Sequence, residues 1–352
     1  MMRSVRIVGS GLIGTSIGLC MKAAGATVEV VDLDINNAKL AQDLIKSSII
    51  AQPELIVVAV PISANQEMVI QLLNANPNSI VCDLASVKSD LLLKVKELSD
   101  QSANFISLHP MAGREVSGAE NARADLFKGR AWIAISDESM SEKAKKIGTD
   151  LVAMCGSTLY WMSSLEHDQT VAKISHLPQI LSSLLAGSLH DISSDNLNLS
   201  GQGLRDLTRL ANSDSKLWSE IFLTNRKVIS PLLDEIINDL QSLKSSLNKN
   251  DKQVFEFMEK GNRGKNKIPG KHGEKARDYS YLPIVIDDKP GELARIFNEC
   301  ANISVNIEDL SIEHSPGQET GLITLALSDA DCVKLSAHLG NLGFKVHQGK
   351  NR

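Results

Sequence analysis

The chain has 352 residues, of which 43% are hydrophobic and 22% charged. These fractions are near globular averages, so disorder and fibrous repeats are excluded, and the length predicts two or three packed domains. The formal net charge of −5 gives no general attraction to polyanions, so neither nucleic acid nor a membrane is expected as a partner.

The cysteines and the first residues favour a cytoplasmic protein. The five cysteines are widely spaced and form no CxxC pair, which disfavours a disulfide framework or a zinc site, and no metal is expected. The N-terminus runs straight into a strand pattern without the apolar stretch of a signal peptide. The strongest apolar run, residues 55–62, is far shorter than the about 20 residues that cross a bilayer.

Residues 1–164 alternate short β-branched runs with helical patterns. The predicted strands are SVRIVG, TVEVVD, ELIVVAV, SIVCDL, NFISLH and RAWIAIS. Short apolar strands that alternate with helices indicate a parallel sheet covered on both faces, which is an α/β, Rossmann-type doubly wound domain.

A glycine motif follows the first predicted strand directly. In GSGLIG, Gly9 allows a tight turn, Gly11 lets the backbone approach a pyrophosphate, and Gly14 lets a helix pack closely against the strand. The helix that begins with Leu12 and Ile13 presents N–H groups and the positive end of its dipole to the phosphates. Three glycines alone are weak evidence, but their place between a strand and a helix makes a dinucleotide site the favoured interpretation.

An acidic residue at the end of the second predicted strand specifies the nucleotide. Asp32 stands 23 residues after Gly9, where a carboxylate accepts hydrogen bonds from both ribose hydroxyls. The same carboxylate repels a 2′-phosphate, and Leu33 follows where an NADP site more often has an arginine. NAD is therefore the expected cofactor, and Asp34 is interpreted as a solvated loop residue.

The fifth predicted strand ends in His109, and ligands of doubly wound sheets collect beyond the carboxyl ends of strands. A histidine with a pKa near neutrality can accept a proton from a hydroxyl that is being oxidised, so catalysis is favoured over packing. Pro110 fixes the backbone after it. The fourth strand leads to Ser86 and Lys88 at the same edge of the sheet. Ser86 could orient the imidazole, contact the nicotinamide or cap a helix, and Lys88 is interpreted as a surface charge.

Residues 165–258 lack strand signals and show apolar residues at helical spacing, which predicts an all-helical second domain. Pro178 and Pro231 are expected to begin or kink helices. The long apolar faces exceed what one small domain can cover, so this domain is the expected interface of a homodimer.

Two stretches of the helical domain carry chemistry. The first, EHDQTVAKISHLPQ, holds His167 and His176, and the second, GLRDLTRLAN, holds Arg205 and Arg209. Arginines four residues apart share a helical face, and a guanidinium among apolar neighbours needs a carboxylate, either that of Asp206 or that of a substrate.

The last part of the chain is predicted to be a separate module. Residues 259–278 have no apolar periodicity and many basic residues, which indicates an exposed linker rather than a phosphate-binding segment. Residues 279–352 show the order β-α-β-β-α-β of a small ferredoxin-like α+β sandwich.

At this point the motifs resemble those of the prephenate and arogenate dehydrogenases of tyrosine biosynthesis. GSGLIGTSIG, DLASVK, HPMAGRE, HDQTVAKISHLPQ and RDLTRLANSD with a following tryptophan occur in the order typical of that family and span residues 4–260. The terminal module resembles an ACT regulatory domain. A β-hydroxyacid dehydrogenase is a rival interpretation, but that class relies on a lysine where this chain has SHLPQ. A regulator that senses NAD without turning it over is the rival outside enzymology.

The resemblance implies roles for individual residues. His109 resembles the catalytic histidine, Ser86 its partner, and His176 a histidine of the cleft near the nicotinamide and the ring carboxylate. Arg209 resembles the arginine that binds the side-chain carboxylate of the substrate. Other positions match the cleft or the motifs with less defined roles: Glu115, Trp218, Arg205 and His167. Two departures from the pattern, Arg114 and Gln179, lie where the side chain of the substrate would be recognised.

The resemblance also implies an activity. The expected reaction is the NAD-dependent oxidative decarboxylation of prephenate to 4-hydroxyphenylpyruvate, with arogenate as the alternative substrate. Tyrosine is the expected effector of the ACT-like module, near Gly291.

Overall fold

The computed structural model describes residues 2–113, 116–247, 251–268, 279–313 and 319–347. The chain divides into two compact units, residues 1–241 and 242–352. The described part of the first unit contains a seven-stranded sheet with helices on both faces and a group of further helices. The described part of the second unit contains a four-stranded sheet and the helices α12, α13 and α14.

The large sheet has the strand order β2-β1-β3-β4-β5-β6-β7, and its first five strands are parallel. Chain order reverses between β1 and β3, which creates the switch point at which doubly wound sheets bind ligands. The strands are β1 (Ser4–Val8), β2 (Thr27–Val31), β3 (Leu55–Val58), β4 (Ile80–Asp83), β5 (Phe105–Pro110), β6 (Ala131–Ile135) and β7 (Thr158–Met162).

The expectation of an entirely parallel sheet was wrong at β6, which runs antiparallel to β5. Residues 111–130 between these strands hold only the short 3-10 turn η2 (Ala119–Asn121) in the described part and no crossover helix. A parallel pair needs a crossover connection, so the chain instead returns from the same end of the sheet. The edge strand β7 was not predicted, because TLYWM is half-exposed and lacks the continuous apolar run of a buried strand.

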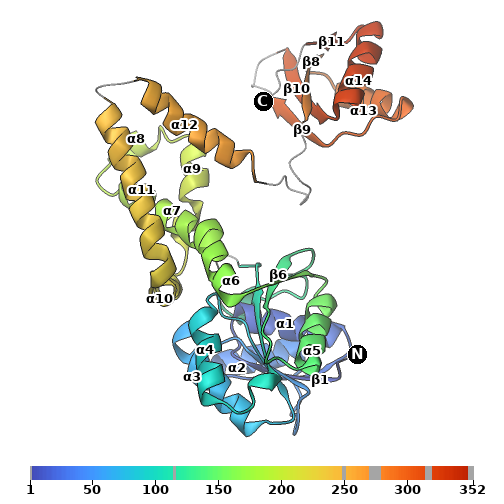
Figure 1. The fold of residues 1–352 in the computed structure, drawn as a ribbon. Helices are drawn as coiled ribbons and strands as arrows, with labels where there is room; N and C mark the ends of the chain where they lie inside the picture. The colour runs from blue at the N-terminus through green and yellow to red at the C-terminus, as the bar shows by residue number, and fades with distance from the viewer. Residues whose placement is uncertain (1, 114–115, 248–250, 269–278, 314–318, 348–352) are drawn as a thin grey trace. The chain divides into compact units, whose positions relative to one another are not determined.

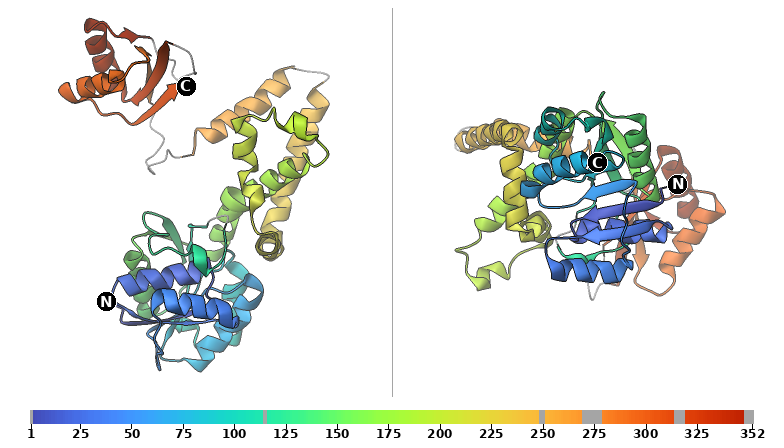
Figure 2. Two further views of the ribbon diagram at one scale, coloured as in Figure 1. Left: turned by 180° about the vertical axis from the view of Figure 1, so that it is seen from behind. Right: turned by 90° about the horizontal axis from the view of Figure 1, so that it is seen from below.

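Helices cover both faces of this sheet, as expected for a doubly wound fold. The helices α1 (Leu12–Ala23), α2 (Ile35–Ile45) and α5 (Glu142–Met154) pack on one face, and α3 (Ile62–Ala75) and α4 (Ser89–Leu98) pack on the other. Turning the molecule by 180° brings α1 and α2 in front of the sheet (Figure 1; Figure 2, left). The central strands β3 and β4 are buried on both faces, which explains their continuous apolar sequence.

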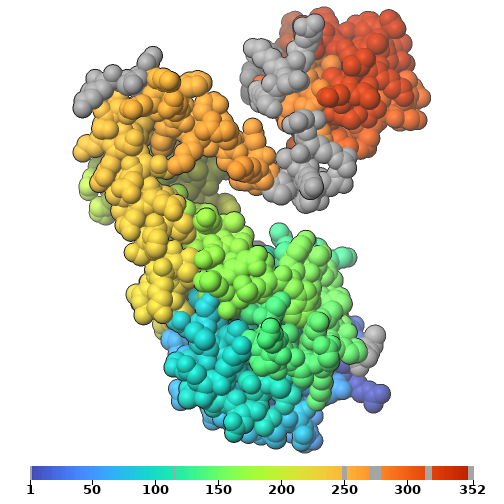
Figure 3. Space-filling view, viewed as in Figure 1, coloured from blue at the N-terminus to red at the C-terminus, as the bar shows by residue number. Residues whose placement is uncertain are grey.

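The expected all-helical domain follows the sheet. It contains α6 (Ser164–Val171), the single π-turn η3 (Ala172–His176), α7 (Leu177–Gly187), α8 (Ser194–Leu197), α9 (Gln202–Thr208), the 3-10 turn η4 (Arg209–Asn212), α10 (Ser215–Thr224) and α11 (Arg226–Ser246). Pro178 lies in the first turn of α7 and Pro231 inside α11. In the space-filling view the light green helices α6 and α7 continue directly from the first domain (Figure 3).

The second unit begins with the end of α11 and contains α12 (Asp251–Lys265). The predicted linker 259–278 is therefore helical up to Lys265, because a helix with a polar surface needs no strict apolar period. The part from 269 to 278 lies outside the described residues. No helix in the described ranges is long and apolar enough to cross a membrane.

The terminal module has the predicted order β-α-β-β-α-β. Its elements are β8 (Ser280–Asp287), α13 (Glu292–Asn302), β9 (Asp309–Glu313), β10 (Thr320–Leu327), α14 (Asp329–Asn341) and β11 (Lys345–Val346). The strands form an antiparallel sheet of order β11-β8-β10-β9, and the helices bury one apolar core against it.

A buried ion pair joins the carboxyl ends of β4 and β5. Lys88, which we expected on the surface, is fully buried, and its Nζ lies 2.8 Å from Asp83 Oδ2 and 2.6 Å from the carbonyl oxygen of Leu108. The hydroxyl of Ser107 donates to the other carboxylate oxygen of Asp83. The sequence pattern alone could not place this lysine, because a buried charge depends on partners from two different strands.

Loss of this lysine is expected to destabilise the fold. In Lys88→Met the carboxylate of Asp83 stays buried without its cation, so the free energy of unfolding should fall by about 3–5 kcal/mol. Urea denaturation measures this change. The control is Lys94→Met, which removes an exposed pair with Glu97 and should change stability by less than about 1 kcal/mol. Equal losses in the two variants would contradict the importance of the buried pair.

Candidate active site

The glycine motif forms a turn that no larger residue could adopt. Gly9 has a φ of +100°, and a Cβ at that position would lie 2.4 Å from the carbonyl oxygen of Ala59. A Cβ on Gly14 would lie 2.0 Å from the carbonyl oxygen of Gly9. These two glycines therefore allow α1 to start immediately beside β1 and β3.

Gly11 differs from the other two glycines, because a Cβ there would meet no protein atom within 4 Å. The first hydrogen bond of α1 joins Thr15 N–H to the carbonyl of Gly11, so the N–H groups of Leu12, Ile13 and Gly14 precede it and have no acceptor in the helix. Open space beside free N–H groups at a helix N-terminus fits a pyrophosphate.

Asp32 lies beyond the end of β2 at the same edge of the sheet. Its Oδ2 accepts hydrogen bonds from the N–H and the hydroxyl of Ser10, and its Oδ1 accepts one from Asp34 N–H. Burial by itself would raise the pKa of Asp32, but these hydrogen bonds outweigh it and lower the pKa. The carboxylate is thus charged at neutral pH. Asp34 is not a plain loop residue as expected, because its side chain caps α2.

His109 is the first member of a hydrogen-bonded chain. Its Nδ1 lies 2.9 Å from Nε2 of His167, and Nδ1 of His167 lies 2.8 Å from Oδ1 of Asp168. His109 is half-buried, whereas the other two side chains are buried. The two histidines come from β5 and α6, so the chain of bonds links the sheet to the helical domain.

The carboxylate determines which nitrogen atoms carry protons. A charged Asp168 only accepts, so Nδ1 of His167 donates to it, and the neutral imidazole then accepts at Nε2. Nδ1 of His109 must therefore donate to His167, which leaves a lone pair on Nε2 of His109. This nitrogen can accept a proton from a ligand.

The pKa values agree with neutral histidines in this chain. Burial lowers the pKa of His109 well below its usual range, and His167, Lys88 and His176 lower it further. Burial also lowers the pKa of His167, although its bond to Asp168 opposes the shift. Burial would raise the pKa of Asp168, but hydrogen bonds from His167 and Ser89 outweigh it.

The N-terminus of α4 holds Asp168 in place. The N–H of Lys88 donates to Oδ1 and the N–H of Ser89 to Oδ2, both at 2.9 Å. These are charge-assisted bonds at the positive end of a helix dipole. Ser86 is half-buried and lies two residues before Lys88, which is the N-cap of α4, so the capping interpretation of Ser86 was wrong.

The π-turn η3 brings His176 close to the same network. His176 follows His167 by nine residues, which in a regular α-helix is about two and a half turns and places the two residues on opposite faces. The π-turn takes up one extra residue and so reduces this angle. As a result, Asn225 Nδ2 donates to the carbonyl oxygen of Asp168 at 3.0 Å and contacts Nδ1 of His176 at 3.2 Å.

His176 therefore presents a donor. Because Nδ1 accepts from Asn225, the proton of the neutral ring lies on Nε2. Burial lowers the pKa of His176 to about 4, with Asp168 opposing, so the ring stays neutral at pH 7. The ring contacts Trp218 and Phe222 edge-on, with centroid distances of 6.1 and 6.5 Å.

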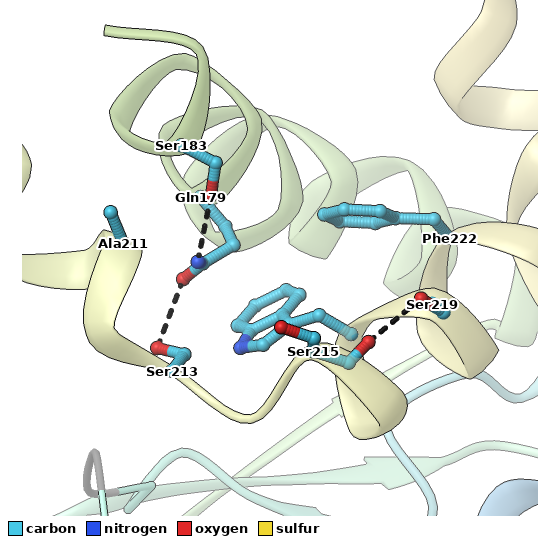
Figure 4. A pocket seen from close by; sticks show the side chains of 8 residues that line it. Gln179, Ser183, Ala211, Ser213, Ser215, Ser219 and Phe222 are labelled. Atoms are coloured by element: carbon cyan, nitrogen blue, oxygen red, sulfur yellow. Dashed lines mark hydrogen bonds between the residues drawn. The ribbon is translucent and has the colours of Figure 1, made fainter. Parts of the chain in front are cut away.

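A cavity of about 190 Å³ is lined in part by these two aromatic side chains (Figure 4). It is formed by α7, η4 and α10. Its lining residues are Gln179, Ser183, Ala211, Ser213, Ser215, Trp218, Ser219 and Phe222. His109 and Arg209 are not part of this lining, although Arg209 begins the turn that supplies Ala211.

The remaining predicted residues lie in different surroundings. Arg205 is exposed on α9 and donates to the carbonyl oxygen of Ser200. Arg209 is exposed at the start of η4, one residue beyond the end of α9. Arg114 and Glu115 lie outside the described residues, so the structure places neither of them. Within the described ranges, no group of three or more His, Cys, Asp or Glu side chains is arranged to hold a metal ion.

Comparison with known protein families matches two adjoining models. The model described as "Prephenate dehydrogenase, nucleotide-binding domain" matches residues 17–161, and the model described as "Prephenate dehydrogenase, dimerization domain" matches residues 163–260. The chain belongs to the prephenate dehydrogenase family. It is therefore an oxidoreductase whose first domain binds a nucleotide.

Several named proteins are similar to this chain in sequence or in fold. NovF of Streptomyces niveus, named a probable prephenate dehydrogenase, is 28% identical, and the match covers 95% of this chain and 96% of NovF. Prephenate dehydrogenase of A. aeolicus, solved with hydroxyphenyl propionate and NAD+, shares the fold with a TM-score of 0.67 and 24% identity, covering 75% of this chain and 96% of its own. Arogenate dehydrogenase of Synechocystis shares it with a TM-score of 0.63 and 23% identity, covering 75% and 99%.

Sequence reasoning missed two residues that organise the site. Asp168 stands next to His167, and this adjacency of a carboxylate and an imidazole was an available signal. Asn225 gave no such signal, because it lies between α10 and α11, 57 residues from Asp168, and only the packing of the helices brings them together.

Substitutions of Gly14 and Gly11 should affect folding and nucleotide binding separately. Gly14→Ala forces a Cβ against backbone, so we expect its unfolding free energy to fall by about 1–3 kcal/mol. Gly11→Ala places its Cβ in open space, so stability should be retained while NAD affinity falls about tenfold or more, since the methyl group occupies the phosphate position. Thermal melting and NAD titration measure the two effects. Wild-type NAD affinity in Gly11→Ala would remove that residue from the binding site.

Proposed function

We propose that this protein is an NAD-dependent prephenate dehydrogenase, which oxidises and decarboxylates prephenate to 4-hydroxyphenylpyruvate in tyrosine biosynthesis. The observation that carries the proposal is the lone pair on Nε2 of His109, directed by the bonds to His167 and Asp168 at the nucleotide-binding edge of the sheet. Arogenate, which would give tyrosine directly, is the alternative substrate.

Separate residues are assigned to proton transfer and to cofactor binding. Nε2 of His109 takes up the proton of the C4 hydroxyl, and His167 and Asp168 stabilise the imidazolium that forms. Bound NAD supplies a hydride acceptor, and departure of the ring carboxylate as carbon dioxide leaves an aromatic ring. Gly9, Gly11 and the first turn of α1, with Asp32 at the ribose, are the residues that would hold this cofactor.

The helical domain is proposed to bind the anionic substrate. Nε2–H of His176 can donate to a carboxylate or a carboxamide in the cleft. Arg209, with Arg205 one turn before it, is assigned to the side-chain carboxylate, because guanidinium groups bind carboxylates in a bidentate manner. Ser86 is assigned to orient His109 or contact the nicotinamide, and Glu115 and Arg114 are assigned to the edge of the cleft.

The domains are proposed to be residues 1–164, which bind NAD, 165–258, which bind substrate and dimerise, and 279–352, which regulate. Leu184, Leu207 and Leu223 of the helical domain are 64%, 65% and 65% exposed, which supports a homodimer through these helices. The five cysteines are free thiols, which supports a reducing cytoplasm.

The terminal module is proposed to act as an ACT-like domain that binds tyrosine near Gly291. Gly291 has a φ of +96° and begins α13. A cavity of about 170 Å³ beside this turn is lined in part by Asp287, Glu292, Arg295 and Phe344. Carboxylates, a guanidinium and an aromatic ring together suit an aromatic amino acid. The alternative is a module that only dimerises.

His109→Asn is expected to lower kcat by about 10²-fold or more, because the base is lost. NAD binding should stay within about twofold of wild type, since the residue does not contact the glycine turn. NADH formation from prephenate and NAD titration measure the two quantities. Wild-type turnover in this variant would remove His109 from its role, and absence of any NADH from the wild-type protein would favour a non-catalytic NAD sensor.

The pH profile provides a control for the same prediction. A lowered pKa keeps the base neutral to lower pH, so kcat/KM of the wild-type protein should stay constant at and above the ordinary histidine value of about 6.5 and fall only below it. An acid limb centred above pH 7 would contradict the neutral chain of histidines.

Tyrosine is expected to inhibit the full chain and not a chain that ends at residue 278. The shortened chain retains the two matched family domains, and so it should keep prephenate turnover. Initial rates with increasing tyrosine measure the effect, with phenylalanine as the control ligand. Equal tyrosine sensitivity in both chains would place the effector site outside the module.

A further inference from the structure

Asn225 lies at the junction of α10 and α11 and is only 3% exposed. Its backbone N–H donates to the carbonyl oxygen of Ile221 at 3.0 Å. Its own carbonyl oxygen accepts from the N–H groups of Val228 and Ile229, at 3.1 and 3.0 Å. The backbone of this residue therefore ends one helix and begins the next, so two helices hold the origin of its side chain in place.

The partners of the Asn225 amide identify its nitrogen end. Nδ2 lies 3.0 Å from the carbonyl oxygen of Asp168. A backbone carbonyl only accepts, so the group that faces it is the NH₂ group and not the amide oxygen. The second hydrogen of this group is then available to Nδ1 of His176, which lies 3.2 Å away. Nδ1 must accept it, and the proton of the neutral imidazole must lie on Nε2.

The other neighbours of the His176 ring do not select a tautomer. Trp218 and Phe222 contact the ring edge-on, with centroid distances of 6.1 and 6.5 Å. A phenyl group has no polar atom, and an indole only donates, so neither can accept a proton from the imidazole. In the described part of the chain, the hydrogen bond at a ring nitrogen of His176 comes from Asn225.

Asp168 connects this amide to the base. Its carboxylate orients His167 and, through it, His109, whereas its carbonyl oxygen holds Asn225. The two outer imidazoles are close enough for His176 to lower the pKa of His109. One residue thus receives the donors that determine both rings, and the two rings have opposite tautomers: His109 presents a lone pair at Nε2, and His176 presents an N–H.

We propose that Asn225 is a positioning residue that holds His176 in the Nε2–H tautomer, so that one imidazole accepts a proton and the other donates a hydrogen bond. The inference rests on the proposed function, in which this N–H meets a carboxylate or carboxamide oxygen in the cleft. In the reverse tautomer Nε2 would direct a lone pair at that oxygen, and two acceptors repel each other. Asn225 acts through His176 and not on the substrate itself.

The tautomer is measured by ¹⁵N NMR of protein with labelled histidines, because protonated and bare ring nitrogens have well-separated chemical shifts. The signals of His176 are those that disappear in His176→Phe. At neutral pH the wild type should carry the proton on Nε2 and none on Nδ1. Asn225→Asp replaces the donor with an acceptor of the same shape, so Nδ1 should carry a proton in that variant.

Two NMR results would overturn the inference. One is a wild-type ring whose proton lies on Nδ1, and the other is an Nδ1 that stays bare in a folded Asn225→Asp protein. The wild-type spectrum decides the first point even if the variant does not fold.

Kinetics test whether Asn225 works through His176. Asn225→Leu removes the amide at nearly constant volume and should lower kcat/KM for prephenate about tenfold. In the His176→Phe background the same substitution should change kcat/KM by less than about twofold, because the ring that it positions is gone. Equal losses in the two backgrounds would show a structural role and overturn the inference.

Asn76→Leu is the matched control. Asn76 is the C-cap residue of α3, as Asn225 is of α10, and its Nδ2 also donates to a backbone carbonyl, that of Leu72. Its loss should leave kcat/KM within about twofold of the wild-type value and the His176 signals unchanged.

The two proposals can fail separately. A protein that oxidises neither prephenate nor arogenate refutes the proposed function, and the NMR comparison still decides the role of Asn225. A protein that oxidises prephenate while His176 carries its proton on Nδ1 retains the proposed function and refutes the inference.

Discussion

The site depends on the hydrogen bonds that the Asp168 carboxylate accepts. This carboxylate accepts two backbone N–H groups from the start of α4 and one imidazole N–H from His167, and the carbonyl of the same residue accepts from Asn225. Because these donors come from the sheet domain and from the helical domain, one buried anion fixes both domains around His109. Its charge is maintained by hydrogen bonds that outweigh the cost of burial.

The ends of β4 and β5 provide the setting for this anion. Lys88 is the N-cap residue of α4. Its backbone N–H donates to the carboxylate of Asp168, and its ammonium group pairs with the buried carboxylate of Asp83. Burial, and after it the neighbouring His167 and Lys88, lower the pKa of His109 and so favour its neutral form. An imidazole that is neutral and already oriented by hydrogen bonds needs little reorganisation to accept a proton.

The helical domain completes this hydrogen-bonded network. The π-turn changes the phase of the helix between His167 and His176, so that one histidine supports the base and the other supplies a donor near the aromatic wall. Gln179 and several serines line a cavity together with Trp218 and Phe222.

The sequence by itself determined the parts whose physical cause is local. Glycine spacing after a strand, β-branched runs and helical periodicity predicted the doubly wound sheet, the helical domain and the order of the terminal module, and the strand end at His109 indicated the base. Tertiary structure alone decided the direction of β6, the burial of Lys88 and the bonds among Asp168, Asn225 and His176. These depend on partners from distant segments, and neither periodicity nor spacing carries information about which buried donor meets which acceptor.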